Sequence, residues 1–196
     1  HIRSIMAYML DSNTVVGMPI IVSPRMENGV RGEATLSSQA DTTRRSGVLN
    51  MGVQIKLNSK TLDYATVLHE IVHGALLPLV TFGRAARAVG VVNTLTKAVE
   101  MYEKIGDNIG KDLMHVIRNR NQYSALRGMI EDAQLKNIFT RDKNGRITGY
   151  NVDEIYAWAL SDENFQTLLR MRPYANRNIF STAYEAVVGG ISRMLG

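Results

Sequence analysis

The spacing of apolar residues predicts strands near the start of the chain and helices over most of the rest. Residues 14–23 form a short apolar run, which is typical of an edge strand. In residues 48–58 apolar and polar side chains alternate, which predicts a half-exposed strand. Residues 27–47 are polar and rich in Gly, Ser and Thr, so we expect a long, mobile loop between the two strands.

Apolar residues then recur at spacings of three and four, which predicts helices. We expect Pro78 to end the first long helix, since proline lacks the N–H that a helix interior uses. Asn144-Gly145 predicts a hairpin within residues 140–150. The predicted helices cover residues 3–10, 61–77, 84–105, 110–132, 152–171 and 179–195. These elements indicate a mainly helical α+β fold with a small sheet.

Composition narrows the class of protein. The 196 residues suit a single domain over 1–196, and a 45% hydrophobic content can build its core. The absence of cysteine excludes disulfides and thiolate metal ligands. No apolar run approaches the roughly 18 residues of a membrane span, and the first residues lack a secretory cleavage pattern. We therefore expect no membrane partner and an intracellular or virion-associated location.

The net charge is +5, from 23 Lys and Arg against 18 Asp and Glu. The basic residues are scattered along the chain, which favours a solvated basic surface. A nucleic-acid partner is the alternative, with weak support, because the aromatic residues of a base-stacking platform are not interleaved with the basic ones.

The segment 66–77, TVLHEIVHGALL, carries the strongest chemical signal. Four residues apart on a helix, His69 and His73 lie about 40° apart around the axis, so both imidazoles can reach one ion. Glu70 lies about 100° from His69, where a carboxylate can take a proton from an attacking water. This is the H-E-x-x-H pattern, which predicts Zn²⁺ bound by the two histidines and Glu70 as the general base. The alternative is an ordinary helix with Glu70 exposed.

A catalytic zinc ion has three protein ligands and one open position. The remaining histidines are His1 and His115, and neither follows His73 at a short spacing. The third ligand is therefore His115 or a carboxylate.

The predicted strand, the short turn and TVLHEIVHG resemble the zincin metallopeptidases. Residues 150–169 are also similar to a stretch that follows the HExxH helix in metallopeptidase domains of large phage and mobile-element polyproteins. As in gluzincins, this resemblance implies that Glu154, on a later helix, is the third zinc ligand. It also implies that a peptide or protein substrate pairs as an added strand along 52–57. One departure is Trp158, where those relatives often carry a second Glu.

Several side chains around Glu154 admit more than one role. Glu154 stands three residues after Asn151, which is also the spacing of a capping box. Asp162 and His115 are alternative ligands, and Asp153 or Asp162 could orient a ligating histidine. Trp158 and Phe165 share a helical face with Glu154 and are expected in the core. The candidate donors to a developing oxyanion are Tyr150, Tyr156, Tyr174 and His115.

Together these observations predict a zinc-dependent peptidase, with endopeptidase activity, in a zincin-like fold. A second hypothesis is a non-enzymatic structural or interaction domain of a phage or mobile-element polyprotein that keeps the fold and associates with nucleic acid. A third is a zinc hydrolase acting on non-peptide amides.

Overall fold

The computed structural model describes residues 19–26, 30–40, 49–119, 124, 129, 132–175 and 179–195. The structure is 61% helix and 17% strand, so the predicted mainly helical α+β class is confirmed. The chain forms two compact units, His1–Val89 and Gly90–Gly196, and each is described by itself. The expectation of a single domain over 1–196 stays a prediction.

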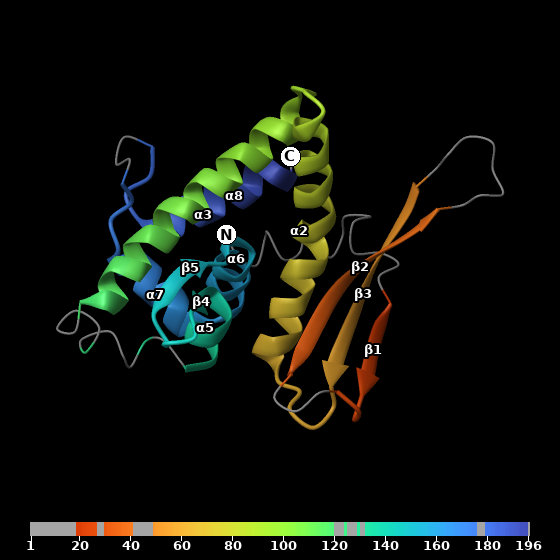
Figure 1. The fold of residues 1–196 in the computed structure, drawn as a ribbon, viewed down its shortest axis with the longest axis horizontal. Helices are drawn as coiled ribbons and strands as arrows, with labels where there is room; N and C mark the ends of the chain where they lie inside the picture. The colour runs from red at the N-terminus through yellow and green to blue at the C-terminus, as the bar shows by residue number, and fades with distance from the viewer. Residues whose placement is uncertain are drawn as a thin grey trace. The chain divides into compact units, whose positions relative to one another are not determined.

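The first unit is a three-stranded sheet with one long helix. The sheet order is β1 (Ile20–Ser23), β3 (Leu49–Asn58) and β2 (Gly32–Ala40), and α2 (Tyr64–Ala88) packs against β2 and β3. Figure 1 shows α2 running alongside β2. Strand β3 pairs parallel with β1 and antiparallel with β2. It therefore forms the centre of the described sheet.

Two expectations for this unit are wrong. The segment 27–47 is not one long loop, because residues 32–40 pair with β3 along their whole length. Strand β3 is also not an edge strand, since residues 55–57 are paired on both sides. Residues 55–57 are therefore not open to an added strand, whereas residues 52–54 pair with β2 alone among the described strands. Both errors have one cause: the Gly, Ser and Thr residues of β2 do not alternate in hydrophobicity.

Helix α2 begins at Tyr64, three residues after the predicted start at residue 61, and it also ends later than predicted. Asp63 is its N-cap, and its Oδ1 accepts the Thr66 N–H at 2.6 Å. The helix continues through Pro78 to Ala88, so the predicted end at Pro78 is wrong. Leu76 and Val80, on either side of the proline, are 3% and 1% exposed. Their burial outweighs the one hydrogen bond that Pro78 removes.

By length and composition alone, α2 is apolar enough to cross a membrane, and half of its most apolar stretch is buried inside the structure. This is weak evidence for a span, because the buried core helix of a soluble protein passes the same test. The expectation that the chain has no membrane partner stays a prediction.

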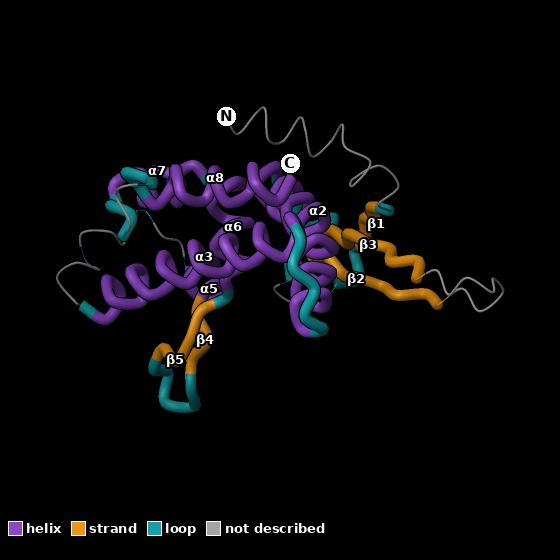
Figure 2. The backbone as a smooth tube through the Cα atoms, turned by 90° about the horizontal axis from the view of Figure 1, so that it is seen from above, coloured by secondary structure: helices purple, strands orange, loops and turns teal. Residues whose placement is uncertain are grey.

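The second unit is a cluster of helices with a small hairpin. Its long helix α3 (Thr94–Arg118) lies beside α8 (Ala183–Leu195), and α6 (Val152–Ser161) contacts both. The other elements are α5 (Asp132–Ile138), β4 (Phe139–Arg141), β5 (Ile147–Tyr150) and α7 (Glu163–Met171). Figure 2 shows the β4–β5 hairpin extending away from these helices. The predicted hairpin around Asn144-Gly145 is confirmed.

Helix α3 differs from its prediction, because it starts at Thr94 and runs without a break to Arg118. The predicted helices 84–105 and 110–132 were separated at a stretch that contains Gly106 and Gly110. Both glycines are instead buried contact points. A Cβ added at Gly106 would lie 2.3 Å from Val152, and one at Gly110 would lie 2.3 Å from a ring carbon of Tyr150. These glycines let α3 approach the chain that enters α6.

The predicted helix 152–171 is two helices joined at Asp162. This residue ends α6, and its Oδ1 accepts the Phe165 N–H at 2.7 Å to begin α7. The final helix begins at Ala183, after a bridge between Pro173 and Thr182. The predicted helix 3–10 and most of residues 120–131 lie outside the described residues.

Candidate metal centre

Helix α2 brings His69 and His73 together on one face, as predicted. Their Nε2 atoms lie 3.1 Å apart, and the ring planes cross at 77°. His69 is 5% exposed and His73 is half-buried. Two imidazole nitrogens are therefore aimed at the same small volume beside the helix.

The separation of the two nitrogens fits zinc. Two ligand atoms about 2.05 Å from a tetrahedral ion are about 3.3 Å apart, which is close to the observed distance. The same distance also fits an N–H···N hydrogen bond between the two rings when no ion is bound. The separation of the two Nε2 atoms is thus already close to the one that a shared ion would require.

Glu70 is buried beside this pair, which differs from the ordinary-helix alternative. It is 6% exposed, and strand β2 passes directly over it. A Cβ added at Gly32 of β2 would lie 2.6 Å from Glu70 Cγ and 2.8 Å from its Oε1. The backbone of β2 therefore fixes the position of the Glu70 side chain. Sequence reasoning missed Gly32, and the glycine within a Ser/Thr-rich strand was its only signal.

The surroundings of this site are otherwise apolar. Val72 and Ala75, on the same helix, are 0% exposed, and Val53, Ile55 and Leu57 of β3 are buried. Placing His69 and Glu70 in such surroundings is costly unless the polar groups are used for binding or hydrogen bonding. A buried histidine and a buried glutamate side by side on one helix are typical of a functional site.

Glu154 lies in the second unit, in the first turn of α6, and is half-buried. The capping-box alternative does not describe it. The Asn151 N–H, which such a box would use, donates to the Ile138 carbonyl at 2.7 Å, and the Asn151 side chain accepts the Asp153 N–H at 3.0 Å. With His69 and His73, Glu154 offers a ligand atom of a type that zinc accepts.

The two alternative ligands have other surroundings. Asp162 is half-buried and caps α7, as described above. His115 is exposed in the last turn of α3, next to the C-terminus of that helix. Asp162 and His115 thus both lie at helix ends, which accounts for their residue types without a metal ion.

The candidate oxyanion donors Tyr150, Tyr156 and Tyr174 each belong to a hydrogen-bond network of the second unit. Tyr150 donates to Asp107, and burial, together with this hydrogen bond, raises the pKa of Tyr150 to about 12. Tyr156 is fully buried, donates to the Tyr102 carbonyl at 3.0 Å, and has its pKa raised well above the usual value by burial. The Tyr174 hydroxyl accepts from Asn108 at 3.1 Å.

Two neighbours of Glu154 in α6 and α7 are core residues, as expected. Trp158 is 9% exposed and Phe165 is 0% exposed. Asp153, which could orient a histidine, accepts the Tyr102 hydroxyl at 2.9 Å. Tyr102 also stacks on Tyr156, with ring centroids 3.9 Å apart. Asp153 therefore has a structural role at the α3–α6 contact.

No family model matches the chain, and no match was found among curated proteins or solved structures. The resemblance to zincins stays a prediction that rests on the two sequence segments quoted above.

Proposed function

We propose that the chain is a zinc-dependent peptidase in which His69, His73 and Glu154 bind the metal and Glu70 is the general base. The observation that supports this most is local to α2. Two imidazole nitrogens 3.1 Å apart stand next to a buried glutamate on a helix that is otherwise apolar. This combination of side chains is the one that metal-assisted hydrolysis uses.

The third ligand is the part of the proposal that rests on the resemblance. Glu154 occupies the matching position in the second segment, and it does not form the capping box that its spacing also suggests. A carboxylate completes a His₂Glu set, which is a ligand set of catalytic zinc sites that leaves one position open.

Zinc, when bound, would polarise the scissile carbonyl and lower the pKa of the attacking water. Glu70 would take the proton of that water and deliver it to the leaving amine. Because β2 covers Glu70, the carboxylate has few other orientations, and little ordering is needed before reaction.

The strand along which we place the substrate is β2 and not β3. In the described part of the sheet β2 is an outer strand, and Gly32 on it contacts Glu70. An extended peptide that pairs with β2 would pass next to the proposed base. This placement replaces the expected pairing along 52–57.

The test compares Glu70→Gln with the parent chain and with Glu100→Gln, an exposed position on α3. Zinc content is measured by elemental analysis, and hydrolysis with a quenched-fluorescent peptide library. We expect all three proteins to bind one zinc ion, and Glu70→Gln alone to lose about 10²- to 10⁴-fold in rate. Full activity in Glu70→Gln, or a parent chain without zinc, would overturn the proposal. Zinc with hydrolysis only of non-peptide amides would support the third hypothesis instead.

A further inference from the structure

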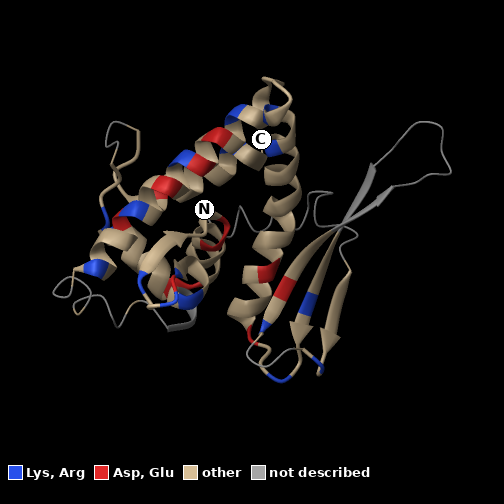
Figure 3. Cartoon of the chain, viewed as in Figure 1, with Lys and Arg blue, Asp and Glu red and all other residues tan. Residues whose placement is uncertain are grey.

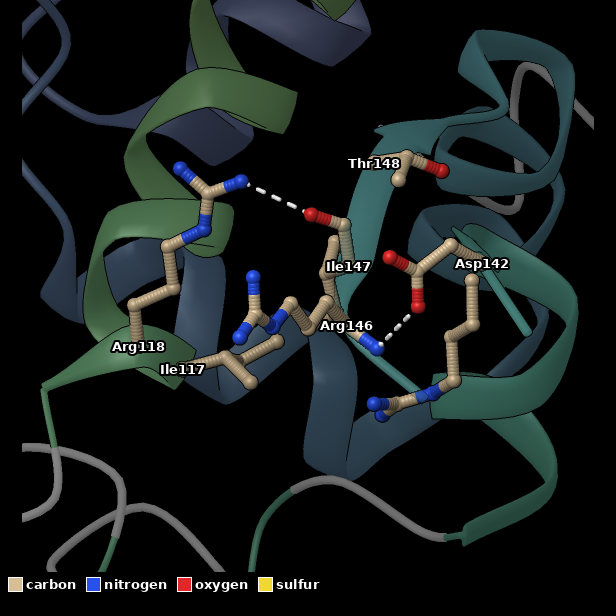
Figure 4. Close-up of a pocket in the computed structure, with 7 residues that line it drawn as sticks. Ile117, Arg118, Asp142, Arg146, Ile147 and Thr148 are labelled. Carbon is tan, nitrogen blue, oxygen red and sulfur yellow. Dashed lines mark hydrogen bonds between the residues drawn. The ribbon is translucent and has the colours of Figure 1, made fainter. Parts of the chain in front are cut away.

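A pocket of about 580 Å³ lies in the second unit, between the end of α3 and the β4–β5 hairpin. Figure 4 shows Arg118 from α3 and Arg146 from the hairpin lining it, near Ile117. We call it the arginine pocket. Its lining is Ile117, Arg118, Arg141, Asp142, Arg146, Ile147 and Thr148.

The arginine pocket has a strong excess of positive charge, because its lining holds three arginines and one aspartate. The aspartate is used within the turn: Asp142 Oδ1 accepts the N–H groups of Asn144 and Arg146 at 2.8 and 2.9 Å. Among the described residues, no salt bridge joins a carboxylate to any of the three arginines. Like charges held this close favour an anionic ligand.

Two of the arginines are held in place by backbone carbonyls. Arg118 donates to the Ile147 carbonyl at 2.8 Å, and Arg141 donates to the Gly145 carbonyl at 2.9 Å. Each guanidinium has five N–H donors, so donors remain for a ligand. A guanidinium already fixed in position loses less freedom when it binds a phosphate group.

The positive charge continues beyond the pocket along the hairpin. Lys143 in the hairpin turn is exposed, as are the hydroxyl-bearing Thr140 and Thr148, and the exposed Lys136 lies on α5 just before β4. Figure 3 shows that α3, in contrast, alternates acidic and basic residues along its length. The hairpin thus carries a basic excess that α3 lacks, and exposed lysine and threonine side chains extend it beyond the arginine pocket.

From this arrangement we propose that the β4–β5 hairpin, with Arg118, binds the phosphodiester backbone of duplex nucleic acid. Arg, Lys, Thr and Asn side chains are the usual phosphate-contacting groups, and a two-stranded ribbon is narrow enough to enter a major groove. Single strands are disfavoured, because the aromatic residues of the hairpin, Phe139 and Tyr150, are buried or half-buried and give bases no stacking surface. This inference is independent of the zinc site.

The experiment uses the full chain and a labelled duplex of about 25 base pairs and arbitrary sequence, followed by fluorescence anisotropy from about 50 to 200 mM salt. The test variant is Arg141→Gln/Arg146→Gln. The matched control, Lys97→Gln/Lys104→Gln, removes the same charge from exposed positions on α3. We expect the test variant to bind about tenfold more weakly and to lower the salt slope by about 2, and the control to change neither by much.

Three outcomes would overturn the inference: no duplex binding by the parent chain, equal losses in both double variants, or tighter binding of a polyglutamate peptide than of the duplex. A second variant guards against misfolding. Arg141→Lys/Arg146→Lys keeps the charges, so it should keep the salt slope, and a slope lowered as in the Gln variant would also refute the proposal. Glu70→Gln should bind the duplex as the parent does, which separates this inference from the peptidase proposal.

Discussion

Helices α2 and α3 are both 25 residues long, yet they bury different kinds of residue. Helix α2 buries His69 and Glu70 among apolar side chains. Helix α3 buries apolar residues and two glycines, and its charged residues are exposed or half-buried. Two helices of equal length therefore differ in what they bury: α3 uses glycines for close packing, and α2 carries ionisable side chains on its buried face.

The difference shows how each irregularity in a helical pattern should be interpreted. A glycine within α3 indicates a neighbour that approaches closely, because only the missing Cβ makes room for Val152 or Tyr150. Ionisable residues gathered on the buried face of α2 are instead typical of a functional site, because burying such groups costs stability that packing alone does not return. The predictions below test this contrast, in order of decreasing effect on activity.

The largest effect is expected from removing a zinc ligand. His73→Ala and Glu154→Gln should lose stoichiometric zinc and reduce peptide hydrolysis to background, because two ligands seldom hold a catalytic ion. The control His115→Ala removes the exposed imidazole of α3 and should keep both properties. Zinc content by elemental analysis and rate are measured on the same samples. If His115→Ala lost the metal instead, the ligand would lie on α3 and the contrast would fail.

A smaller effect is expected where β2 covers Glu70. Gly32→Ala places a methyl group 2.6 Å from Glu70 Cγ, so the carboxylate must shift. We expect a loss of about 10- to 100-fold in kcat/KM, since small displacements of a catalytic group are costly, with zinc content unchanged. The measurement is steady-state kinetics with zinc analysis. An unchanged rate would show that β2 does not position the base.

The smallest effect on activity is expected from the glycines of α3. Gly110→Ala brings a methyl group 2.3 Å from the Tyr150 ring, which should cost about 1–3 kcal/mol of unfolding free energy through overpacking. The measurement is urea denaturation. Gly90→Ala is not a suitable control variant, because the φ of Gly90 is +80°, where an alanine would be strained. Lys104→Ala, on the exposed face of the same helix, is the better control and should change stability by less than about 0.5 kcal/mol. An unchanged stability in Gly110→Ala would show that these glycines do not mark close packing.

The sequence predicts best where one local rule decides the structure. The alternation in residues 48–58 gave β3, the Asn144-Gly145 turn gave the hairpin, and the four-residue spacing of His69 and His73 placed both rings on one face. Each of these depends on neighbours in the chain, so the periodicity of a strand or a helix is sufficient.

The predictions failed where residues far apart in the sequence determine the local structure. Strand β2 forms because its backbone pairs with β3, and its side chains give no alternating signal. Pro78 lies within α2 because burial on both sides of it outweighs a lost hydrogen bond. The role of Gly32 also depends on a residue 38 positions later, which a local pattern cannot indicate.

The central position of β3 has a consequence for how the chain folds during synthesis. Ile20 pairs with Ile55, and Gly32 pairs with Leu57, so both outer strands leave the ribosome before the strand that joins them. Until residue 58 has emerged, neither has its native neighbour, and their open edges are exposed to other chains. A pause in translation after β2 has emerged and before residue 58 has emerged would therefore lengthen the period in which nascent chains can aggregate.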